Sequence, residues 1–308
     1  LVGQWPATGT TRAQLAQAMV GHEVAAPRRQ AGGAAGAAAA SATPVAELRE
    51  ATVRGGDGAR PALDRVSLQM HAREIVAVAG VSGNGQRALA ELLHGLVGAD
   101  AGTVLLHGQP MPARPRAWLA AGVARIPEDR LGTGIVGDMA LWENAALEHY
   151  HAAPLSHHGW LDRAAARRHA QRLVDDGDIR GTEAAGLDTV TRGLSGGNVQ
   201  KLILGRALAP PAAGPVRLIV AAQPTWGLDV GAVAAVHQRL LDACDAGAAV
   251  LLISDDLDEI MALADRVAVI HHGRLTPARP TSHWTLQAIG LAMAGAGPAT
   301  AAPLSHAA

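Results

Sequence analysis

The stretch Glu-Ile-Val-Ala-Val-Ala at positions 74–79, followed by Gly-Val-Ser-Gly-Asn-Gly at positions 80–85, decides the fold of this chain. The first run is short and apolar, which predicts a buried strand, and residues 86–96 continue as a helical run. Gly80 and Gly85 have the spacing of the phosphate-binding loop G-x-x-x-x-G-K-[ST]. A strand, a glycine-rich loop and a helix in this order predict an α/β domain with a backbone cradle for phosphate.

The two positions after Gly85 depart from that pattern. A lysine for the β- and γ-phosphates and a Ser or Thr for Mg²⁺ are expected there, but the chain has Gln86 and Arg87. One charge pair near a protein surface is worth roughly 4 kcal/mol before desolvation, so the missing lysine is a large loss. Arg87 could turn back onto a phosphate, but a guanidinium cannot ligate a cation. The candidate nucleotide-binding residues of this loop are Gly80, Gly83, Asn84, Gly85, Gln86 and Arg87.

A second glycine-rich turn, Leu194-Ser195-Gly196-Gly197-Asn198, precedes another predicted helix. Apolar residues recur on one face with a period of about 3.6 residues, which predicts a helix over 198–208. The first N–H groups of a helix have no helical partner, and the positive end of the helix dipole lies there, so this turn can bind a phosphate. The alternative is a glycine turn that simply leads into a core helix.

A further predicted strand, 216–222, ends without carboxylates. In P-loop nucleotide triphosphatases this strand end carries an Asp for Mg²⁺, and many ATPases add a Glu that positions water. Ala222 and Gln223 stand there instead, and neither can ligate Mg²⁺ through a carboxylate or act as a general base. The branched-aliphatic runs 248–253 and 267–270 predict more strands covered on both faces, and therefore a mainly parallel sheet.

These stretches resemble the ATP-binding subunits of ABC transporters over roughly residues 45–295, because six motifs of that family occur in the family's order. They are Gly80 to Arg87 (Walker A), Pro127-Glu128 (Q-loop), Leu194 to Asn198 (LSGGQ signature), Ala222-Gln223 (Walker B), Gly227-Leu228-Asp229 (D-loop) and Ile253 to Leu257 (H-loop), where Asp255 replaces the switch histidine. The resemblance implies an α/β fold: a P-loop NTPase (ABC ATPase) core with a mainly parallel sheet, a small antiparallel β subdomain around 45–69 and 103–108, and a helical signature subdomain.

Residues 126–130, 194–198 and 227–232 look like the second nucleotide-binding half of tandem importers for ribose-type sugars and nucleosides. In that family two halves pair head to tail, and each ATP lies between the Walker motifs of one half and the signature of the other. The resemblance implies that this chain donates its LSGGN signature to ATP, with Mg²⁺, on an intact partner half. That half would be upstream in the same polypeptide or a dimer mate.

The resemblance gives this chain no complete catalytic set of its own. Four positions are degenerate: Gln86, Ala222, Gln223 and Asp255. The isolated chain is therefore expected to hydrolyse ATP very weakly or not at all. Glu128 and Asp229 join the candidate nucleotide contacts by their place in the Q-loop and D-loop. The alternative function is a non-hydrolysing nucleotide-binding or interaction module that only supports transporter assembly.

The composition divides the chain into four segments. Residues 1–23 are expected to be the tail of a preceding nucleotide-binding domain, since the chain opens with Leu rather than Met and Leu15, Ala18 and Met19 have helical spacing. Residues 24–45 are an Ala/Gly/Pro-rich linker. Residues 46–295 form the ABC ATPase domain, with a helical insert at about 127–207, and residues 296–308 a flexible tail. A disordered tail on a free-standing domain is the alternative for the N-terminal part.

Charge and hydropathy restrict the partners. The net charge of −1 and the lack of a long basic block argue against nucleic acid. No apolar stretch reaches the about 20 residues of a membrane span, so membrane attachment requires a partner. The resemblance implies permease subunits, with a periplasmic or lipoprotein solute-binding protein acting indirectly, at the cytoplasmic face of the bacterial cell membrane. A soluble ABC protein of translation or repair is disfavoured by residues 126–130 and 227–232.

Several side chains have two interpretations. Trp142 is a candidate contact for a permease or a core residue of the insert. The histidines at 149, 151, 157 and 158 form a solvated loop rather than a metal site, because no Cys or carboxylate completes a ligand set. His271-His272 is explained by a turn at a strand end. Cys244 is expected to be a small buried apolar side chain.

Overall fold

The computed structural model describes residues 27–29, 43–55, 60–211 and 214–296. The predicted N-terminal tail, most of the predicted linker and the C-terminal tail beyond residue 296 lie outside these ranges. The described chain forms two compact units. We call residues 43–120 with 249–296 the loop unit, because it contains residues 80–87, and residues 121–248 with 27–29 the signature unit. Each is described by itself.

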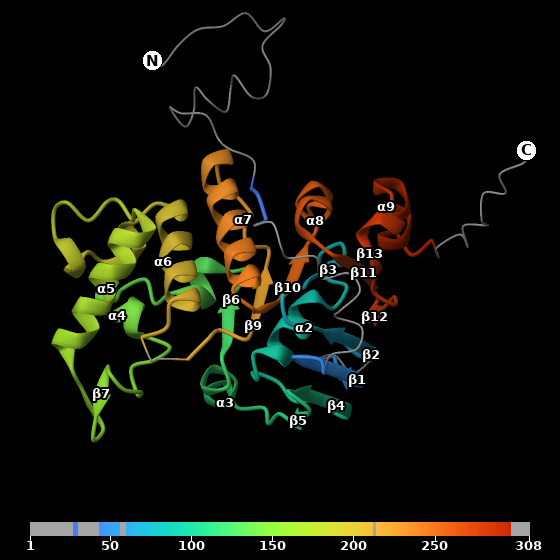
Figure 1. Ribbon diagram of the computed structural model, residues 1–308, viewed down its shortest axis with the longest axis horizontal. Coiled ribbons are helices and arrows are strands. Elements are labelled where there is room, and N and C mark those ends of the chain that lie inside the picture. Colours follow the sequence, from blue (N-terminus) through green and yellow to red (C-terminus); the bar gives the residue numbers. More distant parts are fainter. Residues whose placement is uncertain (1–26, 30–42, 56–59, 212–213, 297–308) are drawn as a thin grey trace, which may run out of the picture. The chain divides into compact units, whose positions relative to one another are not determined.

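The loop unit is built on parallel strands around β3 (Ile75–Ala79), which has β10 (Ala249–Ser254) on one side and β11 (Arg266–His271) on the other. All five residues of β3 are buried, which explains why its sequence is apolar throughout. Two short strands, β12 (Arg274–Leu275) and β13 (Arg279–Pro280), pair antiparallel with β11. The helices of this unit, some of them visible in Figure 1, are α2 (Gln86–Leu93), α3 (Pro115–Ala120), α8 (Leu257–Leu263) and α9 (Leu286–Met293), with a 3₁₀ turn at Thr281–His283.

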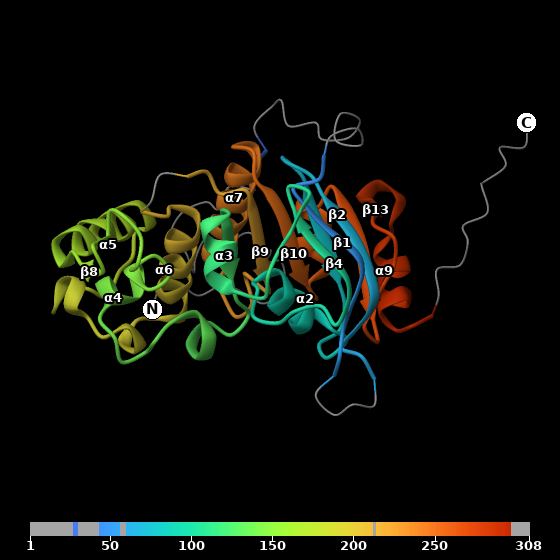
Figure 2. The same cartoon turned by 90° about the horizontal axis from the view of Figure 1, so that it is seen from below.

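A separate antiparallel sheet lies in the same unit, in the strand order β2 (Leu63–Met70), β1 (Ala46–Val53), β4 (Ala101–Leu106) and β5 (Gln109–Pro110). Figure 2 shows β1, β2 and β4 side by side. Buried residues alternate with exposed ones along the second half of β2, as expected for a sheet with one covered face. The antiparallel subdomain predicted from the resemblance is confirmed.

The signature unit pairs β6 (Val123–Ile126) with β9 (Leu218–Ala222) in parallel. Its helices are α4 (Leu141–Ala146), α5 (Arg163–Gly177), α6 (Gly196–Leu208) and α7 (Val230–Asp245). A π-helical turn, η2 (Arg130–Gly134), follows β6, and two 3₁₀ turns cover Gly186–Asp188 and Thr191–Gly193. Parallel strands with helices here, and the antiparallel sheet of the loop unit, confirm the predicted α/β class.

The predicted end of one helix was wrong. The helix expected to run to residue 96 ends at Leu93, because Gly95 adopts a left-handed conformation with φ +69°. Helix α5 begins at Arg163, where Asp162 caps it by accepting a hydrogen bond from Ala165 N. The residues before α5 form a hairpin, β7 (Ser156–His157) with β8 (Trp160–Leu161).

The structure decides between the two interpretations of several side chains. Trp142 is only 8% exposed and has the Arg167 guanidinium 5.9 Å from its ring centre, so it is a core residue and the predicted permease contact is wrong. Cys244 is fully buried, as predicted. His271 ends β11 and the chain turns at His272 and Gly273, which confirms the strand-end turn. None of the helices in the described ranges is long and apolar enough to cross a bilayer.

Candidate nucleotide-binding site

Residues 80–87 connect the end of β3 to the start of α2, as predicted. Gly85 caps α2 in a left-handed conformation with φ +112°, and a Cβ added to it would lie 2.6 Å from the carbonyl oxygen of Ala62. Only glycine fits both the backbone angle and the space. The spacing of Gly80 and Gly85 that pointed to a phosphate-binding loop therefore has a structural reason.

Asn84 fixes this loop to the turn after β11. Its side-chain Nδ2 donates to Val81 O at 2.8 Å, and its Oδ1 accepts from His272 N at 2.9 Å. Gly273 N donates to the Asn84 carbonyl oxygen at 2.9 Å. Asn84 is thus held by its own side chain and by two backbone groups of the turn at residues 271–274.

Gln86, at the position expected for lysine, turns its side chain into the loop and is only 8% exposed. Its Nε2 donates to Val81 O at 2.7 Å, and its Oε1 accepts from Asn84 N at 3.0 Å. A backbone N–H of the phosphate cradle is therefore already bonded to a side-chain oxygen of the same chain. The amide lies inside the loop, where its Nε2 would be 2.7 Å from a Cβ added to Gly80.

Arg87 does not replace the missing lysine in this structure. Its Nε lies 2.7 Å from Glu91 Oε1, one helical turn along α2, and its side chain is 84% exposed. This is the ordinary i, i+4 ion pair of a helix surface. The pairing directs the guanidinium along α2.

Asp255 follows β10, the strand next to β3. Ser254 and Ala79 are partners in the parallel ladder, so Asp255 and Gly80 leave neighbouring strands at the same edge of the sheet. Asp255 is exposed, and Asp256 after it caps α8 by accepting from Asp258 N and Glu259 N. Asp255 therefore lies at the same edge of the sheet as the loop at residues 80–87 and places a carboxylate there.

The signature turn is open to solvent. Ser195 caps α6 and its Oγ accepts from Asn198 N at 3.4 Å and Asn198 Nδ2 at 2.9 Å. Ser195 and Gly196 are exposed, whereas Leu194 is buried beneath the turn. A Cβ added to Gly197 would meet no heavy atom within 4 Å. Helix α6 begins two residues earlier than predicted, so Gly196 and Gly197 are its first residues and their N–H groups have no helical acceptor.

The Q-loop and Walker B positions also share an edge. Ile126 and Ala221 are partners in the ladder of β6 and β9, so Glu128 and Gln223 follow neighbouring strands. Glu128 is exposed, Ala222 is buried and Gln223 has a left-handed φ of +47°. Asp229 caps α7 by accepting from Ala232 N at 2.9 Å.

Arg130 was missed by the sequence reasoning, although it lies in the motif at residues 126–130. Its Nη1 donates to Gly196 O at 3.3 Å, and its Nη2 donates to Trp226 O. Burial lowers the pKa of Arg130. The Arg130 side chain therefore links the segment after the Q-loop to the signature turn and to Trp226, the residue directly before the D-loop.

A buried ion cluster behind the signature helix was also missed. Arg206 of α6 is 2% exposed and donates to Gly134 O at 2.8 Å and Asn144 O at 3.1 Å. Glu148 Oε1 accepts from Arg125 Nη2 at 2.7 Å and from Arg206 Nη2 at 3.4 Å. Burial alone would raise the pKa of Glu148, but Arg206 and Arg125 hold it below its ordinary value. The cluster fastens α6 to β6 and to the segment after η2.

The predicted positions do not fit a Mg²⁺ ion. Gln86, Ala222 and Gln223 supply no carboxylate and residue 87 no hydroxyl, whereas Mg²⁺ is bound through carboxylates, phosphates and water. Within the described ranges, no group of three or more His, Cys, Asp or Glu side chains is arranged to hold a metal ion. Phosphate is different, since the open N-terminus of α6 has the donors that such a ligand requires.

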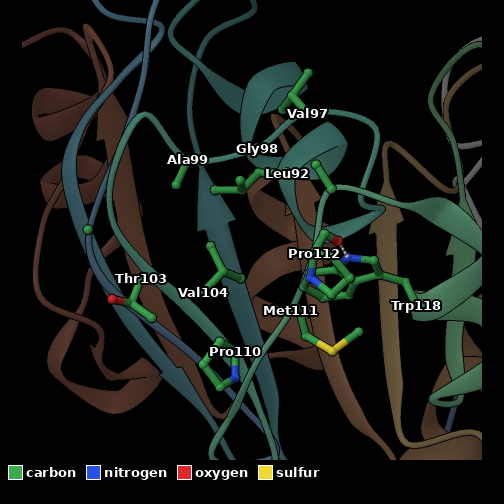
Figure 3. A pocket seen from close by; sticks show the side chains of 12 residues that line it. Leu92, Val97, Gly98, Ala99, Thr103, Val104, Pro110, Met111, Pro112 and Trp118 are labelled. Atoms are coloured by element: carbon green, nitrogen blue, oxygen red, sulfur yellow. Dashed lines mark hydrogen bonds between the residues drawn. The ribbon is translucent and has the colours of Figure 1, made fainter.

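A hollow of about 290 Å³ lies elsewhere in the loop unit, between the end of α2, β4 and the segment before α3. Figure 3 shows Trp118 on one side of it, with its ring N–H bonded to Pro112 O at 2.9 Å. None of the residues described as lining it is charged, and none is a predicted site residue. The hollow therefore offers little to a nucleotide phosphate.

Comparison with known proteins agrees with this geometry. A family model described as "ABC transporter" matches residues 63–213. The chain is 39% identical to a nucleoside import ATP-binding protein of Lactococcus lactis, over 92% of this chain and 54% of that protein. It is 39% identical to a guanosine import ATP-binding protein of Bacillus subtilis over 93% of this chain and 54% of that protein. A ribose import ATP-binding protein of Rubrobacter xylanophilus is 38% identical over 78% of this chain and 47% of that protein.

The chain thus spans about half the length of these relatives. A solved ATP-binding subunit of an ABC transporter superposes with a TM-score of 0.64 at 21% identity, over 81% of this chain and 99% of that one. An ATP-binding cassette of an ABC transporter superposes with a TM-score of 0.65 at 18% identity, over 83% of this chain and 99% of that one. The fold is therefore that of the ABC ATPases, and residues 63–213 form an ABC transporter ATP-binding domain.

Proposed function

We propose that this chain is an ATP-binding part of an importer for nucleosides or ribose-type sugars, and that it donates residues 194–198 to an ATP bound on a partner half. The observation that carries the proposal is a contrast between two glycine-rich turns. The turn at Ser195 to Gly197 is open and has helix N–H donors. The loop at residues 80–87 is filled by the Gln86 amide.

In this proposal the work of hydrolysis is divided between two halves. The partner half supplies the lysine, the Mg²⁺-binding carboxylate and the switch histidine. This chain supplies the N–H groups of Gly196 and Gly197, which stabilise charge on the γ-phosphate as it is transferred. By itself the chain turns over little or no ATP.

The assembly follows from the same proposal. Residues 46–295 are the ABC ATPase domain, with its helical insert at about 127–207. The partner half is upstream in the same polypeptide or a dimer mate. Permease subunits hold the pair at the cytoplasmic face of the membrane, and a solute-binding protein delivers the solute to them. The relatives named for nucleoside, guanosine and ribose import support this solute class.

One observation favours a second candidate function. The Gln86 amide is hydrogen-bonded to Val81 O and Asn84 N, so the N–H of Asn84 is already occupied inside the loop. The second candidate function is therefore a module that takes no part in ATP hydrolysis and only supports assembly of the transporter. The signature turn distinguishes the two functions, because only the first requires its N–H groups.

Gly197→Leu tests the proposed function in the assembled protein. The backbone there is helical and the space is open, so the variant folds, but its side chain covers the turn. We expect ATP hydrolysis to fall about a hundredfold, the typical cost of losing a preorganised donor. Gly290→Leu is the matched control, because Gly290 is also helical with open space around its Cβ position. Unchanged ATPase in Gly197→Leu with altered assembly would support the second function instead.

A further inference from the structure

Arg130 occupies a position from which it can control two exposed turns of the signature unit at once. It is the first residue of η2, and Asp129 caps that turn by accepting a hydrogen bond from Gly132 N at 2.8 Å. Its guanidinium donates to the carbonyl oxygens of Gly196 and Trp226. Gly196 is part of the signature turn, and Trp226 directly precedes residues 227–229.

The Arg130 guanidinium lies at ordinary contact distance from the Cβ positions of two glycines, Gly196 and Gly227. A Cβ added to Gly227 would lie 3.4 Å from Arg130 Nη2, and one added to Gly196 would lie 3.7 Å from Nη1. Gly227 also has a left-handed φ of +66°. The planar fork therefore lies over two positions without side chains, and it reaches two carbonyls of different segments. A lysine, with a single nitrogen, cannot match that geometry.

A second tie joins the same two segments deeper in the unit. Gln200 of α6 is 1% exposed, and its Nε2 donates to Pro224 O at 2.7 Å. The base of the turn at residues 224–229 is thus fixed to α6, and Arg130 bonds to Trp226 O at its exposed end. Glycine-containing turns have much conformational freedom, so the exposed end needs such a restraint to keep one shape.

We propose that Arg130 is a positioning residue that holds the signature turn and the turn at residues 226–229 in one fixed arrangement. The proposal rests on the proposed function, because it concerns how this chain presents its signature to ATP on the partner half. Arg130 acts through Gly196 and Trp226 and does not itself contact the nucleotide. A surface that is already ordered loses less entropy when the partner half binds.

We call the tie from Arg130 to the two turns the brace. Hydrogen exchange of the full chain tests the brace without an ATPase assay. Arg130→Lys keeps the positive charge but loses the second donor nitrogen of the guanidinium, and Arg130→Met removes both the charge and the donors. We expect backbone amides in both 194–198 and 226–229 to exchange about tenfold faster in both variants, as expected for the loss of charged hydrogen bonds. Arg180→Lys is the matched control, since its exposed guanidinium pairs with Asp178. Unchanged exchange in either segment of the Met variant would overturn the proposal.

ATP hydrolysis by the assembled protein gives a second readout. We expect kcat to fall about tenfold in both Arg130 variants with KM little changed, because the brace positions a group that acts in the transition state. Wild-type kcat in Arg130→Lys together with a low kcat in Arg130→Met would show that charge, not the fork, matters, and would contradict the brace. If Gly197→Leu leaves the ATPase unchanged while Arg130 variants still loosen both turns, the proposed function fails and the brace stands.

Discussion

At the scale of single residues, the Gln86 side chain lies inside the loop at 80–87. Its amide accepts from Asn84 N and donates to Val81 O, and we expect these two bonds to hinder phosphate binding there. The sequence reasoning identified the loss of charge at this position. It could not show that the replacing side chain turns inward, because that depends on the loop's own backbone geometry.

Replacing Gln86 tests this interpretation. Gln86→Ala frees Asn84 N, and Gln86→Lys also restores the cation, so we expect the Lys variant to bind ATP at least about tenfold more tightly than wild type. Equilibrium dialysis of labelled ATP against the purified chain measures this affinity. Gln171→Lys on the exposed face of α5 controls for added charge. Wild-type binding as tight as that of Gln86→Lys would show that the amide does not block the loop.

Arg130 shows a second limit of sequence reasoning at this scale. Its two acceptors lie 66 and 96 positions away in the chain, and no local pattern connects them. The motif at residues 126–130 was the available signal. By contrast, the glycine turn at Ser195 could be placed before a helix because the apolar period that follows it is local in sequence.

At the scale of elements, the ion cluster of Arg206, Glu148 and Arg125 anchors α6. We expect Glu148→Gln to lower the free energy of unfolding by about 3–5 kcal/mol, because the buried guanidinium of Arg206 and the partly buried one of Arg125 lose their counter-charge. Urea denaturation of the chain at neutral pH measures the change. Asp188→Asn is the control, since it removes an exposed ion pair with Arg167 and should change stability little. Equal effects of the two substitutions would contradict the role of the cluster.

Strands were predicted better than the boundary between hairpin and helix. Strands β3, β9 and β10 are buried at every residue, so their sequences are short apolar runs bounded by polar or glycine residues. The start of α5 could not be predicted in the same way. Trp160 is 82% exposed in a two-residue strand, and its pairing with His157 is a tertiary choice that periodicity does not encode.

At the scale of the whole molecule, stability should depend on pH through His169. Burial first, then the charge of Arg172 and His149, lowers the pKa of His169 from 6.5 to about 4. Below pH 6.5 the unfolded chain takes up a proton that the folded chain does not, so stability is present above that pH and is lost progressively down to about pH 4. Between pH 7.5 and pH 5 this amounts to about 2 kcal/mol.

His169→Leu should remove that part of the pH dependence. His169 Nε2 has no hydrogen-bond partner among the described residues. An apolar replacement therefore breaks no described hydrogen bond to this nitrogen. Urea denaturation of both proteins at the two pH values gives the comparison. The same loss of stability in wild type and variant would assign the pH dependence to other groups.

The division of labour between two halves is the central claim, and hydrolysis of MgATP by the purified chain alone tests it most directly. The Gln86 amide inside the loop at residues 80–87, the residues Ala222 and Gln223 and the carboxylate at Asp255 predict little or no phosphate release by the chain alone. Activity should appear only when a half with an intact lysine, carboxylate and histidine is present. A rate for the chain alone comparable to that of an intact ABC dimer would contradict the account.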